Sequence, residues 1–168
     1  MFFYEKFVKI LFVLVGEVMR YLGLDLGTRT LGVAISDTSH IIASPLTVIR
    51  FPEGQYEIAL EELKKILDEY QISKIALGLP KNMNGSEGFA SERSRLFKEL
   101  LEQNIDIPVY LVDERLSTME AENILLEVDL SRKKRKKVID GVAAVIILET
   151  FIKMEENKWM KKKIVILQ

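Results

Sequence analysis

The chain has 168 residues, of which 48% are hydrophobic and 29% charged, and its formal net charge is −1. These values fit one packed domain and exclude a disordered chain or one embedded in a membrane. With no cysteine and a single histidine, the chain cannot form disulfides, zinc–thiolate sites or multi-histidine metal sites, so any metal must bind carboxylates and carbonyls, which favours Mg²⁺ or Mn²⁺.

The first eighteen residues are mostly apolar and loosely similar to a secretory signal. However, Glu5, Lys6 and Lys9 interrupt the apolar run, no small-residue cleavage site follows, and the run is too short to span a bilayer. Because Met19 stands directly before the first expected strand, we interpret residues 1–18 as an N-terminal extension or the product of an upstream start. We therefore expect a cytoplasmic protein with no membrane partner.

Three short apolar segments come next, over 20–25, 31–36 and 43–49. Short links rich in Gly, Thr, Asp and Ser join them, which is typical of an antiparallel meander. The pattern then changes to a helical period over 57–71. The apolar positions of this helix are Leu63, Ile66, Leu67 and Tyr70.

A second group of elements alternates between strand and helix. The segments 74–80 and 108–114 are predicted strands, and 81–88 is a polar loop between the first of them and a helix. We expect the apolar face of that helix to consist of Phe89, Leu96, Phe97, Leu100 and Leu101.

The last part of the chain is predicted to be helical with one basic interruption. Ser117 and Glu120 form a capping box that opens a helix to about Val128. The basic segment 131–137 follows as a loop, and a final helix is expected from about Val138 to Met154. The whole pattern predicts one α/β domain over 19–155, with a five-stranded mixed sheet flanked by helices and a tail at 156–168.

Three acidic positions are expected to converge at one edge of this sheet. Strands joined by helical crossovers run parallel, so the strands that begin at residues 20, 74 and 108 end at the same edge, where α/β folds bind ligands. Asp25 and the pair Asp113–Glu114 stand at such ends. Asp140 opens the last helix, which the small residues after it allow to lie close to the sheet. These small residues are Gly141, Ala143 and Ala144.

Carboxylates gathered without histidine or cysteine need a cation. Like charges about 4 Å apart cost on the order of 4 kcal/mol at an effective dielectric constant near 20. Two divalent ions at roughly 4 Å can polarise a phosphodiester, activate water and stabilise the leaving oxygen, and Asp25 is best placed to bridge them. Each acid also has a structural alternative: Asp25 as a turn cap, Glu114 as an ion-pair partner of Arg115 or Arg29, and Asp140 as a helix N-terminal acid.

Three further motifs of the chain each have a simpler interpretation as well as a functional one. The segment at 131–137 is either a solvated loop or a patch that follows phosphates, and its place directly before Asp140 favours contact with a nucleic-acid backbone. Its basic residues are Arg132, Lys133, Lys134, Arg135, Lys136 and Lys137. His40 is interpreted as a surface residue rather than a catalyst. The segment 25–28, DLGT, is also similar to the first phosphate loop of actin-like ATPases, but those proteins need a second domain to close on ATP.

Four motifs together resemble the YqgF/RuvX family: DLGTRTLGVAISD (25–37), GLPKNMNGSEG (78–88), VDERLST (112–118) and IDGVAAVIIL (139–148). This resemblance implies an RNase H-like fold and a nuclease that acts on Holliday junctions or on the 5′ end of pre-16S rRNA. It implies that the catalytic and metal-binding acids are Asp25, Glu114 and Asp140, with Asp113 as a less certain neighbour. It also implies nucleic-acid contacts from Arg29, Arg115, Lys81, Asn82 and Asn84.

We therefore expect an endonuclease that uses Mg²⁺ or Mn²⁺ and takes structured precursor rRNA as its substrate. Cleavage of branched DNA is the first alternative, and it would require a homodimer to cut two symmetric strands, whereas RNA cleavage is open to a monomer. A non-catalytic RNA-binding or assembly factor is the second alternative.

Overall fold

The computed structural model describes residues 19–116 and 132–167, with side chains described for 19–116 and 141–165. The expected N-terminal extension and the helix expected over 117–128 lie outside these residues. The elements in chain order are β1 (Arg20–Leu26), β2 (Thr30–Ser36), β3 (Ala43–Arg50), α2 (Tyr56–Glu69), β4 (Ile72–Leu79), α3 (Phe89–Asn104), β5 (Val109–Asp113), the single 3₁₀ turn η1 (Glu114–Leu116) and α5 (Arg132–Leu167).

The five strands form one mixed sheet in the order β3-β2-β1-β4-β5. β1 pairs antiparallel with β2, and β2 pairs antiparallel with β3, whereas β4 is parallel to both β1 and β5. An antiparallel meander therefore leads into two parallel strands, which confirms the RNase H-like architecture expected from the sequence. Because β1, β4 and β5 are mutually parallel, their carboxyl ends lie at one edge of the sheet.

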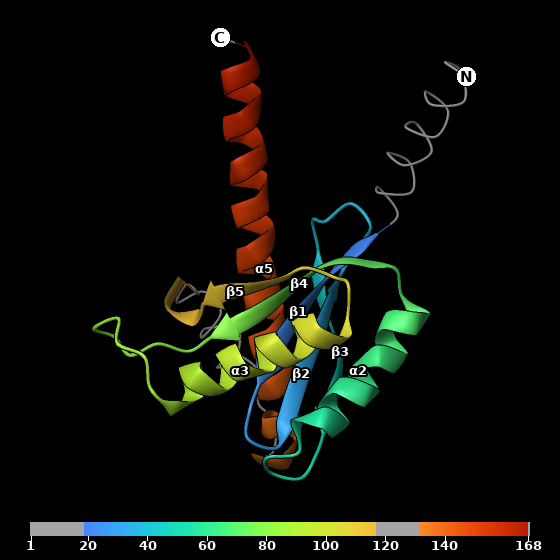
Figure 1. The fold of residues 1–168 in the computed structure, drawn as a ribbon. Helices are drawn as coiled ribbons and strands as arrows, with labels where there is room; N and C mark the ends of the chain where they lie inside the picture. Colours follow the sequence, from blue (N-terminus) through green and yellow to red (C-terminus); the bar gives the residue numbers. More distant parts are fainter. Residues whose placement is uncertain (1–18, 117–131, 168) are drawn as a thin grey trace.

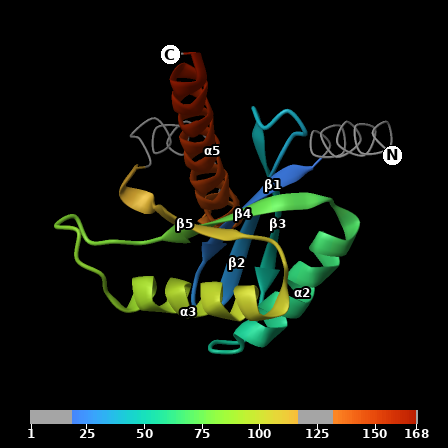
Figure 2. The same ribbon diagram turned by 45° about the horizontal axis from the view of Figure 1, so that its top comes forward.

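Helices cover both faces of the sheet (Figures 1 and 2). α2 and α3 close one face over a large apolar cluster that includes the fully buried Leu24, Leu63 and Leu101. α5 crosses the other face, where Leu148 and Phe151 are buried against the strands. The central strands β1 and β4 are therefore covered on both sides, which explains why their sequences are nearly continuous runs of apolar residues.

The close approach of α5 depends on small residues, as expected. A Cβ atom at Gly23 on β1 would stand 2.7 Å from the carbonyl oxygen of Ala144 and 2.7 Å from the Cβ of Leu148. Ala144 is fully buried and Gly141 is also buried. Gly23 and Ala144 therefore set the spacing at which α5 lies on the sheet.

Two helical predictions need correction. α5 begins at Arg132 and extends to Leu167, so the basic segment from Arg132 onward and most of the tail are helical, whereas a loop and a helix over 138–154 were expected. The physical reason is that Lys, Arg and Met are good helix formers and the segments on both sides of the expected helix contain no proline or glycine. Although α5 is long, none of the helices in the described ranges carries the sustained apolar stretch that crossing a membrane requires.

The second correction concerns the buried face of α3. Phe97 and Leu101 are buried as expected, but Phe89 is 90% exposed and Leu96 is 58% exposed. The buried face is completed by Ser91 and Ser94. Small serines at these positions let the helix lie close to its neighbours, so the two larger apolar residues face water instead.

Candidate active site at the carboxyl edge of the sheet

Asp25 lies one residue before the end of β1, the central strand of the sheet. Its neighbours Leu24 and Leu26 are buried, while Asp25 itself is only half-buried. Side chains alternate along a strand, so Asp25 lies on the same face as Gly23, the residue against which α5 packs. The tight turn that follows is closed by the N–H of Gly27, which donates to the carbonyl of Thr30 at 2.7 Å.

Glu114 lies directly after β5 and reaches back over β4. Its Oε1 atom is so close to Gly78 that a Cβ there would stand 2.6 Å from it, and the same Cβ would stand 2.5 Å from Cδ1 of Ile147. Gly78 follows Leu77, which pairs with Leu24, just as Asp25 follows Leu24. The Glu114 carboxylate therefore lies under α5, at the level of Asp25.

The two acids interact electrostatically. Burial, and after it the negative charges of Asp25 and Asp113, raises the pKa of the Glu114 carboxyl from 4.5 to about 7. A hollow of about 90 Å³ opens beside Glu114, between the end of β5 and α5. The geometry therefore brings Asp25 and Glu114 close to each other at one edge of the sheet, while their role as metal-binding acids stays a prediction.

The third predicted acid, Asp140, lies in α5, but its side chain is outside the described part of the structure. Its place in the helix is four residues before the buried Ala144, and Ala143 lines the hollow beside Glu114. Among the described side chains, no group of three or more acids and histidines gathers as a metal site. The three-carboxylate site thus remains a prediction, with two of its members close to each other.

The donor chemistry suits a hard divalent cation. Asp25 and Glu114 supply carboxylate oxygens, which are the ligands that Mg²⁺ and Mn²⁺ prefer. A carboxyl group whose pKa is raised towards neutrality by burial and by neighbouring carboxylates is also one that a bound cation would return to its charged form. The residues present therefore fit the metal that the sequence indicated.

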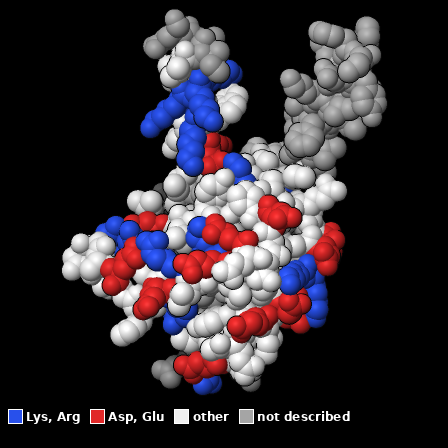
Figure 3. Space-filling model, viewed as in Figure 1, with Lys and Arg blue, Asp and Glu red and all other residues white. Residues whose placement is uncertain are grey.

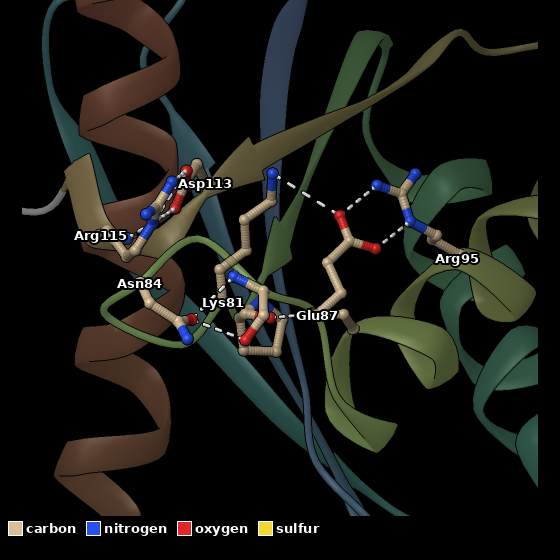
Figure 4. Close-up of polar contacts among 9 residues, drawn as sticks. Lys81, Asn84, Glu87, Arg95, Asp113 and Arg115 are labelled. Atoms are coloured by element: carbon tan, nitrogen blue, oxygen red, sulfur yellow. Dashed lines mark hydrogen bonds and ion pairs between the residues drawn. The ribbon is translucent and has the colours of Figure 1, made fainter.

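Asp113 is used differently from Glu114. Its carboxylate binds the guanidinium of Arg115, with 2.7 Å from Nη2 to Oδ2 and 3.1 Å from Nε to Oδ1. Arg115 lowers the pKa of Asp113, first through these hydrogen bonds. Asp113 therefore holds a predicted phosphate-binding arginine at the edge of the sheet, as Figure 4 shows.

The loop over 81–88 is braced by its own polar side chains. Asn84 accepts hydrogen bonds from the N–H and hydroxyl of Ser86 at 3.0 and 2.6 Å, and the Asn82 amide donates to the Ser86 hydroxyl at 2.8 Å. The loop turns at Gly85, where φ is +85°, and the Arg115 guanidinium lies against that glycine. Both predicted asparagines thus shape the loop from within and bring its turn next to Arg115.

Carboxylates also hold the other predicted cations of this edge. Glu87 binds Arg95 through two contacts of 2.6 and 2.8 Å and lies 3.5 Å from the ammonium of Lys81 (Figure 4). Arg29, in the turn after β1, pairs with Glu53 at 3.0 Å on the surface. In the free protein, Lys81, Arg29 and Arg115 are therefore each matched by an acid.

His40 lies at the opposite end of β1 from Asp25. Its ring stacks on Tyr21 with 3.9 Å between ring centroids, and its Nε2 atom is 2.7 Å from the carbonyl oxygen of Met19. His40 is half-buried and has a positive φ of 54°. It therefore fixes the chain before β1, far along the strand from the acids, and its role is structural.

Sequence reasoning missed two features of this edge. The first is the ion pair between Glu87, in the polar loop, and Arg95, outside the expected apolar face of the helix that follows. The second is the close approach of Glu114 and Ile147 to Gly78. The apolar pattern of β4 gives no sign of this contact, although a glycine near the end of a strand can indicate that another group approaches closely.

We expect the stability of the metal-free protein to fall as the pH rises from about 4.5 to about 7. The folded protein retains the proton of Glu114 in this window while the unfolded chain releases it, so unfolding becomes more favourable with increasing pH. Urea unfolding of the wild type and of Glu114→Gln at several pH values in a chelating buffer measures the effect. Glu114→Gln should flatten this part of the profile, and Glu99→Gln, which removes an exposed acid on α3, should not. Identical profiles for wild type and Glu114→Gln would contradict the raised pKa.

Comparison with known proteins supplies an independent line of evidence. The model of the family RuvX, described as Holliday junction resolvase, matches residues 19–154. A protein of Geobacillus sp. (strain WCH70) is 52% identical over 134 residues, which cover 80% of this chain and 97% of the relative. A protein of Natranaerobius thermophilus is 49% identical over 140 residues, covering 83% and 98%. Both are named "Putative pre-16S rRNA nuclease".

Solved structures with a similar fold are much more distant in sequence. RuvC of Thermus thermophilus in complex with a Holliday junction substrate is 13% identical, with a TM-score of 0.49 over 81% of this chain and 96% of that one. The Fowlpox virus Holliday junction resolvase is 14% identical, with a TM-score of 0.49 over 81% and 99%.

Proposed function

The chain belongs to the RuvX family of nucleases, and from that premise we propose that it is a divalent-metal-dependent endonuclease that processes the 5′ end of pre-16S rRNA in the cytoplasm. The observation that supports the catalytic part is the pair Asp25–Glu114 at the carboxyl edge, where burial, and after it the charge of Asp25, raises the pKa of Glu114. The names of the relatives at about 50% identity support the choice of substrate.

In this proposal Asp25, Glu114 and Asp140 would hold Mg²⁺ or Mn²⁺. The bound cation would supply positive charge to polarise the phosphodiester and lower the pKa of the attacking water. Glu114, with a pKa of about 7, exchanges its proton at neutral pH, so it is ready to become a ligand there. Asp25 would supply another carboxylate ligand from the end of the central strand.

The cationic side chains of this edge would bind the nucleic-acid backbone. Arg115 and Lys81 are held beside the acids, and Arg29 lies in the turn that follows β1. The six basic residues of 132–137, at the start of α5, are proposed to contact phosphates as well. Phosphate contacts fix position and register without reading bases, so we expect the substrate to be recognised by its shape.

In the direct test, precursor rRNA and a four-way DNA junction are incubated in parallel with the purified protein. Each substrate is tested with Mg²⁺, with Mn²⁺ and with chelator. We expect cleavage of the precursor near the mature 5′ end, only with metal, and no symmetric cutting of the junction. Symmetric junction cutting by a dimer would favour the resolvase named in the family description. Binding of RNA without cleavage under every condition would favour the non-catalytic assembly factor.

We expect Glu87→Gln to increase affinity for nucleic acid. Its removal releases Lys81, the cation at this edge, from a carboxylate that Lys81 shares with Arg95 of α3, so one additional cation becomes available to phosphates at the edge. The slope of log affinity against log salt should become steeper by about one. Filter binding or anisotropy with a fluorescent RNA across a salt series measures both.

The matched control for this variant is Glu61→Gln, which frees Lys64 on α2 in the same way, on a helix away from the edge. It should leave both affinity and salt slope unchanged. Equal effects from the two variants would mean that only net charge matters, and weaker binding by Glu87→Gln would mean that the loop needs this ion pair for its shape.

A further inference from the structure

The C-terminal part of α5 leaves the body of the protein. Among the described side chains of α5, Ile152 is the last buried one, and all residues from Glu156 to Val165 are exposed. At 1.5 Å per residue, the 15 residues that follow Ile152 up to Leu167 extend about 22 Å. Figures 1 and 3 show this part of α5, which we call the α5 extension (Glu156–Leu167), standing clear of the sheet.

The α5 extension carries large apolar side chains in contact with water. The exposed ones are Trp159 (60%), Met160 (57%), Ile164 (56%) and Val165 (72%). Trp159 and Met160 follow Ile152 by seven and eight residues, so the face of α5 that packs on the sheet continues past the edge of the sheet. An exposed apolar group of this kind indicates a contact that the described residues do not provide.

A cavity of about 810 Å³ lies at the base of the α5 extension. Tyr21 and His40 line it from the start of β1 and from the β2–β3 turn, and Ile152, Trp159 and Met160 line it from α5. On its floor Lys74 pairs with Glu155. Cavities of this size hold a drug-sized ligand, so this one has room for several side chains.

The segment 1–18 joins the body at the rim of this cavity. Its last residue precedes Met19, whose carbonyl oxygen is 2.7 Å from Nε2 of His40, and His40 lines the cavity. Thirteen of these eighteen residues are apolar or aromatic, and its four charged residues, two acidic and two basic, cancel. Both this segment and the α5 extension fall outside the range matched by the family model, 19–154.

We propose that residues 1–18 dock in this cavity and along the apolar face of the α5 extension. Tethering at Met19 gives the segment an effective concentration in the millimolar range, which a second copy of the chain at micromolar concentration cannot match. Both partners are apolar, and burying them together removes from water the largest exposed apolar groups of this end of the molecule. Each extension is therefore the partner of the other.

Fluorescence of the full chain tests the proposal directly, because Trp159 is its one tryptophan. We expect blue-shifted emission and weak quenching by acrylamide. The variant Phe7→Ser, Leu11→Ser, Leu14→Ser should shift the emission to the red and raise the quenching constant several-fold. Phe89→Ser with Leu96→Ser, which removes exposed apolar groups on α3, should change neither. If acrylamide quenches Trp159 of the wild type as readily as Trp159 of the triple serine variant in residues 1–18, the proposal is overturned.

Disulfide trapping separates the possible partners, since the chain has no cysteine of its own. Met160→Cys is combined in turn with Val8→Cys, Leu11→Cys and Val15→Cys, and the proteins are oxidised at low concentration. An intramolecular cross-link in at least one pair supports docking within the chain, because a disulfide forms only where Cα atoms come within about 7 Å. Only intermolecular cross-links would assign the face to a second copy, and a Trp159 blue shift that requires lipid vesicles would assign it to a membrane surface; either result overturns the proposal.

Discussion

Asp25→Asn should lower phosphodiester cleavage by more than about 100-fold while leaving affinity for nucleic acid intact. Removing a group that only orients a metal ligand typically costs 10- to 100-fold, so removing a proposed ligand on the central strand should cost more. The cations that would bind the backbone, Arg115 and Lys81, have their own carboxylate partners and do not depend on Asp25. Single-turnover cleavage of precursor rRNA, together with binding measured in chelator, separates the two effects.

The same variant should make the metal-free protein more stable at neutral pH. The charge of Asp25 is one of the causes that raise the pKa of Glu114, so its removal lets Glu114 ionise more easily and weakens the repulsion at the edge. A loss of activity accompanied by a gain in stability cannot be explained by misfolding. Thermal unfolding with and without Mg²⁺ measures this gain, which added metal should abolish because metal stabilises only the wild type.

Asp68→Asn is the matched control, since it removes an exposed carboxylate from α2. It should change neither cleavage nor stability. If Asp25→Asn cleaves as well as this control, Asp25 is a structural residue of its turn and the catalytic proposal fails. The non-catalytic reading, in which the protein binds RNA and assists assembly, would then be favoured.

Strand positions and the edge of the sheet were predictable because they depend on local signals. Apolar runs bounded by Gly, Thr and Asp define the strands, and the parallel direction of β1, β4 and β5 follows from their helical connections. Asp25 and Glu114 could therefore be brought together from the sequence, although they are far apart along it. What places them there is the topology, which needs no knowledge of side-chain packing.

The buried face of α3 was not predictable in the same way. A hydrophobic count selects Phe89 and Leu96, yet the structure buries two serines in this helix. The reason is that α3 lies close to the sheet, so only small side chains fit at some buried positions, whatever their polarity. The distance between helix and sheet is set by tertiary packing and cannot be read from the local sequence. The sequence analysis underestimated the length of α5 because it relied on the apolar pattern. The charged ends of α5 have helical propensity, but no apolar periodicity there indicates a helix.

The ion pairs of the edge follow from tertiary placement too. Glu87 precedes the start of α3 and Arg95 lies within it, so their contact depends on how the loop folds back at Gly85. At this edge, Glu114, which would bind metal, lies near other acids. Lys81 and Arg115, which would bind phosphate, are each paired with an acid. In the proposed complex, phosphates would replace some of these ion pairs, so the acidic partners Glu87 and Asp113 would compete with the substrate for Lys81 and Arg115.

Gly78→Ala should lower cleavage by about 100-fold while costing little stability. The new Cβ would stand 2.6 Å from Oε1 of Glu114 and 2.5 Å from Cδ1 of Ile147, so both groups must move. Each is the far end of a flexible side chain, and replacing glycine reduces the entropy of the unfolded chain by about 0.4–1 kcal/mol, which offsets part of the strain. A carboxylate misplaced by about 1 Å, however, can cost on the order of 100-fold in rate.

Gly23→Ala gives the contrasting case. Its Cβ would meet the carbonyl oxygen of Ala144, a backbone atom that can move only with α5 itself. We therefore expect a loss of about 2–3 kcal/mol in the free energy of unfolding, at the upper end of the usual cost of overpacking. Urea unfolding of Gly23→Ala and Gly78→Ala compares a rigid obstacle with a flexible one on the same face of the sheet.

Ile147→Val decides between packing and chemistry at Gly78, because it removes the Cδ1 atom and leaves Glu114 unchanged. Alone it should cost about 1 kcal/mol with activity retained. Combined with Gly78→Ala, it should regain the stability lost by Ile147→Val, since the new methyl group fills the space that Cδ1 leaves. Cleavage by the double variant should stay low because the Glu114 carboxylate is still displaced. Recovery of cleavage together with stability would mean that Gly78 serves only the packing of α5, and that the position of Glu114 over β4 is not what the reaction requires.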